Sequence, residues 1–236
     1  AQRNNPPATD FVNLSGKKFN TVHANNFEFY EEINAVIQKE PADALPAEVV
    51  GTLAAIGIKK GQPFEPDARM RAILEDAVAV GNATSRAIIF AQQDKRGFYF
   101  PDRQWKTSFI GGSSEFEDNG ERLKDARVLF HYYATVITPA MATPKVGTGS
   151  VYAYVERDAK GDYLDGGKTY SITLPAPIPV NNFWSFMVYD NQTRSMLETD
   201  QKSAGLDSNS PDVKPNADGS YTIYFGPKKL RTLKAA

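Results

Sequence analysis

The sequence predicts an α+β protein in which a helical N-terminal region packs on an antiparallel β-sandwich, of jelly-roll type, with one inserted helix. Residues 27–94 are rich in Ala, Glu, Ile and Val, and they contain no Tyr or Trp after Tyr30. Residues 98–225 hold ten of the eleven Tyr and both Trp, which favour half-buried strand surfaces. Short apolar runs separated by turn sequences in this second part are typical of a sandwich.

Two helices are expected near the N-terminus. Asn26 can cap a helix that begins at Phe27, and Pro41 ends it because the residue before a proline is excluded from the helical region. A second helix over residues 46–55 starts with Pro at its first position and ends at Gly57. Residues 1–24 show turn formers without periodicity, so they are expected to be extended or looped.

Two longer helices follow. Asp67 begins a helix whose apolar residues recur at helical spacing as far as Ile89, and Gly81-Asn82 is expected to loosen it in the middle. Residues 121–138 are expected to form a fourth helix, which is the one inserted in the β-rich part. The composition changes near Lys95–Gly97, which predicts a helical region over residues 1–96 and a β-sandwich over residues 97–236.

Four segments are predicted to be strands. Apolar and polar residues alternate over residues 151–156, 170–174 and 221–225, as in strands with one buried face. Residues 183–189 are apolar at nearly every position, which predicts a central strand covered on both faces. The Asp218-Gly219 pair is a turn signal before the last strand.

Composition excludes several classes of function. The formal net charge is −1, so the chain lacks the excess of positive charge that nucleic-acid binders carry. The absence of cysteine excludes disulfides, thiolate metal sites, iron–sulfur clusters and cysteine nucleophiles. No run approaches the ~20 apolar residues of a membrane span. We therefore predict no metal, no cofactor, no nucleic-acid partner and no membrane span.

Several ordered motifs carry a resemblance to known families. Residues 164–167 and 175–179 read Leu-Asp-Gly-Gly and Pro-Ala-Pro-Ile-Pro, and they are followed by the 183–190 run and by Asn-Ala-Asp-Gly-Ser-Tyr-Thr-Ile-Tyr-Phe-Gly-Pro over 216–227. This combination resembles the domain of unknown function 1214. Residues 56–64, Ile-Gly-Ile-Lys-Lys-Gly-Gln-Pro-Phe, with the helix after them, resemble the end of its companion, the domain of unknown function 1254. The resemblance implies a bacterial, periplasmic or secreted protein with a jelly-roll C-terminal half.

Two departures from the family pattern predict a partner. Most of the N-terminal part of the companion domain is missing, and the closing strands after Tyr-Phe-Gly-Pro are replaced by a basic tail. The chain begins Ala-Gln-Arg-Asn-Asn without an initiator Met, so we expect that it is a piece of a longer protein or that a leader has been removed. A sandwich without closing strands exposes a sheet edge. We expect a homo-oligomer or another chain to cover that edge.

Four side chains are candidates for acid–base chemistry. Glu156 is predicted to project from the same strand face as Tyr152 and Tyr154, because alternate residues of a strand share a face. Asp190 and Asp200 follow the strand that contains Trp184. His131, on the fourth helix, is the better candidate of the two histidines.

Four further side chains are candidates for binding a substrate. Tyr152, Tyr154 and Trp184 would form an aromatic platform, and Arg194 stands between the candidate carboxylates. The alternative interpretation is a structural one, in which the strand face carries ion pairs and the aromatic residues form the core.

Two classes of function follow from these features. The first is a binding or structural module that works with other chains or within a larger exported protein. The alternative is a carbohydrate-active hydrolase or lyase in which two carboxylates beside aromatic residues cleave a glycan. A groove holding two carboxylates would favour the enzyme, whereas a packed aromatic face would favour the module.

Overall fold

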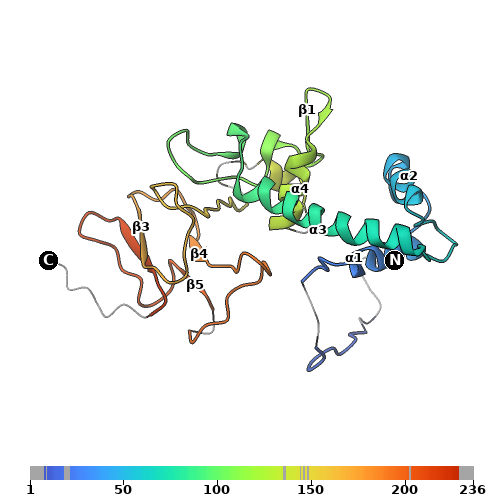
Figure 1. The fold of residues 1–236 in the computed structure, drawn as a ribbon. Coiled ribbons are helices and arrows are strands. Elements are labelled where there is room, and N and C mark those ends of the chain that lie inside the picture. Colours follow the sequence, from blue (N-terminus) through green and yellow to red (C-terminus); the bar gives the residue numbers. More distant parts are fainter. Residues whose placement is uncertain are drawn as a thin grey trace. The chain divides into compact units, whose positions relative to one another are not determined.

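The computed structural model describes residues 8, 10–18, 22–134, 137–143, 145, 147, 149–201 and 203–228. It contains helices and short antiparallel sheets, so the α+β class is confirmed (Figure 1). The chain divides into two compact units, residues 1–65 and residues 66–236. This division falls before the long third helix, whereas the change in composition that set the predicted boundary falls at residues 95–97.

The first unit is built on the two helices α1 (Glu28–Lys39) and α2 (Ala47–Ala55), both close to their predicted bounds. The Asn26 side chain accepts a hydrogen bond from the Glu28 amide at 3.0 Å, which satisfies a donor at the start of α1. At its other end, the Lys60 ammonium donates to the backbone oxygens of Gln38 and Glu40 at 2.8 and 2.7 Å. A positive charge on terminal carbonyl groups stabilises the end of a helix.

The second unit begins with α3 (Ala68–Phe90), the longest helix of the described chain. The Asp67 side chain caps it by accepting a hydrogen bond from the Met70 amide at 2.7 Å, as predicted. The expected loosening at Gly81-Asn82 is wrong, because the helix runs without a break through these residues. A glycine inside a helix lowers the stability of the helix by about 1 kcal/mol relative to alanine. The packing of the last turns of α3 in the core offsets this loss.

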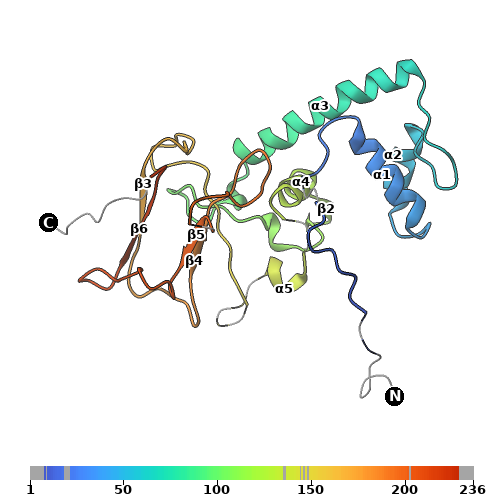
Figure 2. The same cartoon turned by 90° about the horizontal axis from the view of Figure 1, so that it is seen from below.

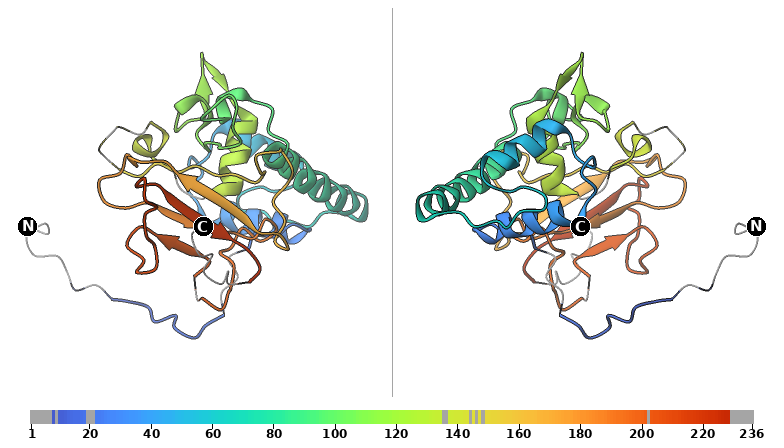
Figure 3. Two further views of the ribbon diagram at one scale, coloured as in Figure 1. Left: turned by 90° about the vertical axis from the view of Figure 1, so that its left-hand side faces the viewer. Right: turned by 90° about the vertical axis from the view of Figure 1, so that its right-hand side faces the viewer.

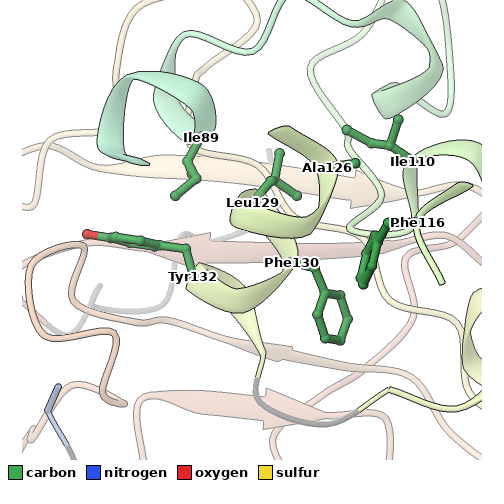
Figure 4. Close-up of a cluster of buried hydrophobic side chains, with 7 residues drawn as sticks. All are labelled: Ile89, Ile110, Phe116, Ala126, Leu129, Phe130 and Tyr132. Carbon is green, nitrogen blue, oxygen red and sulfur yellow. The ribbon is translucent and has the colours of Figure 1, made fainter. Parts of the chain in front are cut away.

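The core of the second unit lies between α3 and α4 (Lys124–Tyr133). Ile89 and Leu129 lie in this cluster at 0% and 1% exposure. Figure 4 shows them on the two helices, with the phenylalanine rings of Phe116 and Phe130 close by. The fourth helix is shorter than the predicted 121–138: residues 121–122 belong to β2, and residues 135–136 lie outside the described residues. A short helix α5 (Pro139–Ala142) follows.

Three two-stranded antiparallel sheets make up the strand content of the described residues. β1 (Glu117–Asp118) and β2 (Glu121–Arg122) form a hairpin that projects away from α4 (Figure 3). β3 (Tyr170–Leu174) pairs with β6 (Tyr221–Phe225), so both predicted strands are confirmed to the residue. β4 (Ser185–Met187) pairs with β5 (Gly205–Asp207), as Figure 2 shows.

The third predicted strand is not the central strand that we expected. Within residues 183–189 the odd-numbered residues are exposed and the even-numbered ones half-buried, so only one face is covered. Residues 151–156 are also irregular: Tyr154 forms a single bridge to Lys106 and no extended ladder. A jelly-roll sandwich is therefore not confirmed, because the described strands form separate pairs.

Gly205 makes the close pairing of β4 and β5 possible. A Cβ atom at this position would lie 2.5 Å from the backbone oxygen of Phe186 and 2.8 Å from Cε of Met187. We predict that Gly205→Ala lowers the free energy of unfolding of the second unit by about 1–3 kcal/mol through overpacking. Urea denaturation followed by tryptophan fluorescence measures this change, since Trp105 and Trp184 both belong to the second unit.

Gly166→Ala is the matched control for this variant. No atom lies within 4 Å of a Cβ placed at Gly166, and its φ is not in the left-handed region. Equal stabilities of Gly205→Ala and Gly166→Ala would contradict the prediction.

No helix in the described part of the chain is long and apolar enough to cross a membrane.

Candidate functional site

Three extended segments bring the candidate Glu156 next to a lysine that lies far away in the sequence. Lys106 forms antiparallel bridges with Phe98 on one side and Tyr154 on the other. The backbone groups of Lys106 and Tyr154 exchange hydrogen bonds at 2.9 and 3.0 Å. Bridged residues have side chains on the same face, and residues two apart share it. This register places Phe98, Lys106, Tyr154 and Glu156 on one face.

The Lys106 ammonium and the Glu156 carboxylate form a buried ion pair through Oε1 of the glutamate. Their side chains are 4% and 13% exposed. The ammonium also lies 5.3 Å from the centre of the Phe98 ring, an arrangement that attracts a cation. The second oxygen of Glu156, Oε2, is buried and has no hydrogen-bond partner among the described residues. The carboxylate is therefore anchored to the fold by one charge-assisted contact.

Two stacked tyrosines lie beside this ion pair. The Tyr133 ring, from the end of α4, stacks on the Tyr154 ring with centroids 4.1 Å apart and an angle of 12°. Burial raises the pKa of Tyr154 to about 12, although a hydrogen bond with Ser108 acts in the opposite direction. Burial, and then the negative charge of Glu156, raise the pKa of Tyr133. Both shifts favour the protonated form of the phenol.

A pocket of about 300 Å³ lies beside the ion pair. We call it the Lys106 pocket. Its wall combines two cationic side chains, three side-chain amides and two aromatic rings with two small residues: Lys106, Arg157, Gln92, Gln93, Gln104, Phe90, Phe98, Ala91 and Gly161. The described lining contains two cationic residues and no carboxylate, and Glu156 pairs with Lys106 from outside the lining.

Asp190 and Arg194 build a tight turn rather than an open site. The Asp190 carboxylate accepts hydrogen bonds from the amides of Thr193 and Gln192 at 2.7 and 2.9 Å, and these bonds lower its pKa. Arg194 has φ of 61°, in the region that favours glycine. Its guanidinium nevertheless donates to the backbone oxygen of Tyr132 at 3.2 Å and lies 4.8 Å from that ring. Arg194 thus caps the end of α4.

The remaining candidates do not join Glu156. His131 lies in the last turn of α4, and partial burial together with the charge of Arg194 lowers the pKa of its imidazole. Asp200 is exposed in a turn, and Tyr152 is 57% exposed and lines a second, smaller pocket of about 160 Å³. The described residues contain no group of three His, Asp or Glu side chains that could hold a metal ion.

Trp184 belongs to an aromatic cluster that joins two sheets. Its ring meets those of Tyr221 on β6 and Phe186 on β4 nearly at right angles, with centroids 5.3 and 6.0 Å away. Phe186 continues the cluster to Trp105 and to Phe225 at 6.5 and 5.8 Å. The position of Trp184 in this packing favours the structural interpretation of the ring over a sugar-binding platform.

The opposite face of the same strand is apolar and exposed. Phe183, Met187 and Tyr189 are 55%, 39% and 57% exposed, and Ser185 stands between them. On the side of β5, the backbone oxygen of Trp184 accepts a hydrogen bond from the Ser208 amide, and the Val188 amide donates to the backbone oxygen of Ala204. Since these groups alternate in direction along a strand, those of Ser185 and Met187 point to the other edge. No described strand pairs with that edge.

Sequence reasoning missed Lys106 and Tyr133. Lys106 follows a tryptophan in a polar segment, and nothing local distinguishes it from an exposed lysine. Tyr133 was placed correctly on a helix, but its ring partner lies on a segment 21 positions away. A co-varying pair of positions 106 and 156 is the signal that could reveal this contact.

Residues 149–235 match the family described as "Protein of unknown function (DUF1214)", so the predicted resemblance of the C-terminal part is confirmed. The resemblance of the upstream part to the domain of unknown function 1254 stays a prediction. The sequence matches no curated protein.

A structural comparison also finds the crystal structure of the VPA0106 protein from Vibrio parahaemolyticus. It aligns over 95% of this chain and 48% of the other, with 18% identity and a TM-score of 0.37. The chain thus spans about half the length of that protein chain.

Proposed function

We propose that the chain is a binding or structural module whose second unit pairs with a second copy of the same chain through the strand of residues 183–189. The observation that carries this proposal is the exposed apolar face of that strand beside its unpaired edge. We also propose that the chain works within a larger exported protein, in the periplasm or outside the cell.

The composition of the strand supports pairing with itself. Edge strands usually carry charged residues or proline, which prevent association with other strands. No Lys, Arg, Asp or Glu occurs over residues 169–189, and residues 183–189 contain no proline. A two-fold axis beside Phe186 would place Phe183 next to Tyr189 of the second copy, so apolar rings would meet without any like charges.

The carbohydrate-active alternative has less support. Glycoside cleavage needs two carboxylates that face one substrate. Glu156 is buried against Lys106, Asp190 accepts the amides of its own turn, and Asp200 is exposed in another turn. These separate environments favour the module over the enzyme.

Light scattering coupled to size-exclusion chromatography tests the proposal on the full chain. We expect a dimer that dissociates on dilution. Ser185→Lys places a charge on the exposed face next to the edge, and we expect it to give a monomer with an unchanged circular dichroism spectrum.

Val180→Lys adds the same charge at a residue that is 44% exposed but lies outside the strand, and it should leave the dimer intact. A wild-type chain that is monomeric at every concentration, or equal dissociation of both variants, would refute this function.

A further inference from the structure

We propose that the Lys106 pocket binds a small organic molecule with one carboxylate group. The residues that line the pocket are different from those of the paired strand in the proposed dimer. Its chemistry is given by three features of the described lining: the sign and number of its charges, its amide groups, and its aromatic rings.

The charges of the lining select a single negative charge. Lys106 and Arg157 both line the pocket, and Glu156 compensates Lys106 from outside the lining. The Arg157 guanidinium donates to the backbone oxygens of Phe90 and Gly161 at 3.1 and 2.8 Å and to the Tyr163 hydroxyl at 2.6 Å. All three acceptors are uncharged, so the positive charge of Arg157 is not neutralised by them. About one positive charge therefore remains for a ligand.

The position of this excess charge is held firmly. The guanidinium lies 3.9 Å from the centre of the Tyr163 ring, and the Tyr163 hydroxyl itself donates to the Phe90 oxygen at 2.9 Å. These contacts tie Arg157 to the end of α3. A cation that is already oriented loses little conformational freedom when an anion binds.

The size and the neutral lining define the rest of the ligand. A volume of about 300 Å³ lies at the lower end of the range for small-molecule sites. Phe90 and Phe98 offer apolar ring surfaces, and the amides of Gln92, Gln93 and Gln104 can exchange hydrogen bonds with hydroxyl or carboxylate oxygens. A molecule the size of benzoate or glucuronate fits this description.

Titrations of the isotope-labelled full chain followed by ¹H–¹⁵N spectra test the proposal. The probes are sodium benzoate, sodium glucuronate, sodium phosphate and glucose. We expect saturable shifts of the Gln92 and Gln104 side-chain amides with at least one carboxylate, and none with glucose. No saturable shift with either carboxylate, equal binding of glucose, or tighter binding of phosphate would overturn the proposal.

A pair of substitutions at Gln104 tests the charge preference without disturbing the buried ion pair. Gln104→Glu adds a carboxylate to the wall, and we expect it to weaken carboxylate binding about tenfold or more. Gln104→Ala removes the same amide without adding a charge, so its effect should be much smaller. Equal affinities of the two variants would overturn the proposal.

A second pair tests Lys106 directly. Glu156→Gln removes the competing carboxylate, so it should bind the carboxylate that shifts the wild-type spectrum at least as tightly as the wild type does. Adding Lys106→Met to that variant should weaken binding about tenfold or more. Equal affinities in Glu156→Gln and the double variant would show that Lys106 does not contact the ligand and would contradict the assignment.

Discussion

Replacing Lys106 by Met is expected to lower the free energy of unfolding of the second unit by about 3–5 kcal/mol, because it leaves a buried carboxylate without its counter-charge. The Glu156 side chain is 13% exposed, and its Oε2 atom has no described partner. Oε1 would then lose its charged partner as well. Urea denaturation followed by tryptophan fluorescence measures the change in the second unit, which contains both tryptophans.

Two comparisons identify the cause. The double variant Lys106→Met with Glu156→Gln should be more stable than Lys106→Met alone, since no buried charge remains unpaired. Lys160→Met changes an exposed lysine and should alter stability by no more than about 0.5 kcal/mol. If Lys106→Met were as mild as Lys160→Met, the ion pair would not stabilise the fold.

The second large effect is expected at Ile89. Its side chain is fully buried in the cluster between α3 and α4, so Ile89→Ala removes apolar contacts and leaves a cavity. Such a truncation costs about 2–5 kcal/mol. The same fluorescence-detected denaturation measures it. A loss of this size would show that the α3–α4 cluster is the main core of the second unit.

Ile73→Ala provides a control within the same helix. Ile73 is 44% exposed, and alanine has a higher helix propensity than isoleucine at both positions. The difference between the two variants therefore reports mainly burial. We expect Ile73→Ala to cost less than about 1 kcal/mol. Similar losses at the two positions would mean that Ile89 is not in a packed core.

Local chemistry explains which elements were predicted well. The Asp67 cap sets the start of α3, the proline before α2 precedes its first turn, and Pro41 ends the helical conformation before it. Strict alternation over residues 170–174 and 221–225 marks strands with one buried face, and the two strands pair in full register. Each of these signals acts over a few residues, so it can be interpreted without knowing the rest of the fold.

The apolar run 183–189 shows where such signals mislead. Seven consecutive residues without a charge predict coverage of both faces, but the fold covers only the side of Trp184, Phe186 and Val188. Hydrophobicity reports that a face can be buried, not which element covers it. In the proposed dimer, the second copy would pair with the free edge of this run, and a single chain cannot display that pairing.

The candidate site depends even more on distant contacts. Glu156 and Tyr154 were correctly expected to share a face, because that depends only on strand geometry. The partner of Glu156 is Lys106, 50 positions away, and the ring on Tyr154 comes from α4. Asp190 was predicted to be a catalytic candidate because other charged residues lie near it in the sequence. In the structure, its carboxylate accepts hydrogen bonds from amides of its own turn.

The sequence alone predicts an α+β chain, the capped helices, the strands β3 and β6, and the lack of thiol chemistry. Tertiary structure alone decided that the strands form separate pairs, that Glu156 is neutralised by Lys106, and that a pocket lined by Lys106 and Arg157 lies beside them. The physical reason is that caps and alternation are properties of a few adjacent residues. Ion pairs, pockets and covered faces instead depend on which distant segments the folded chain brings into contact.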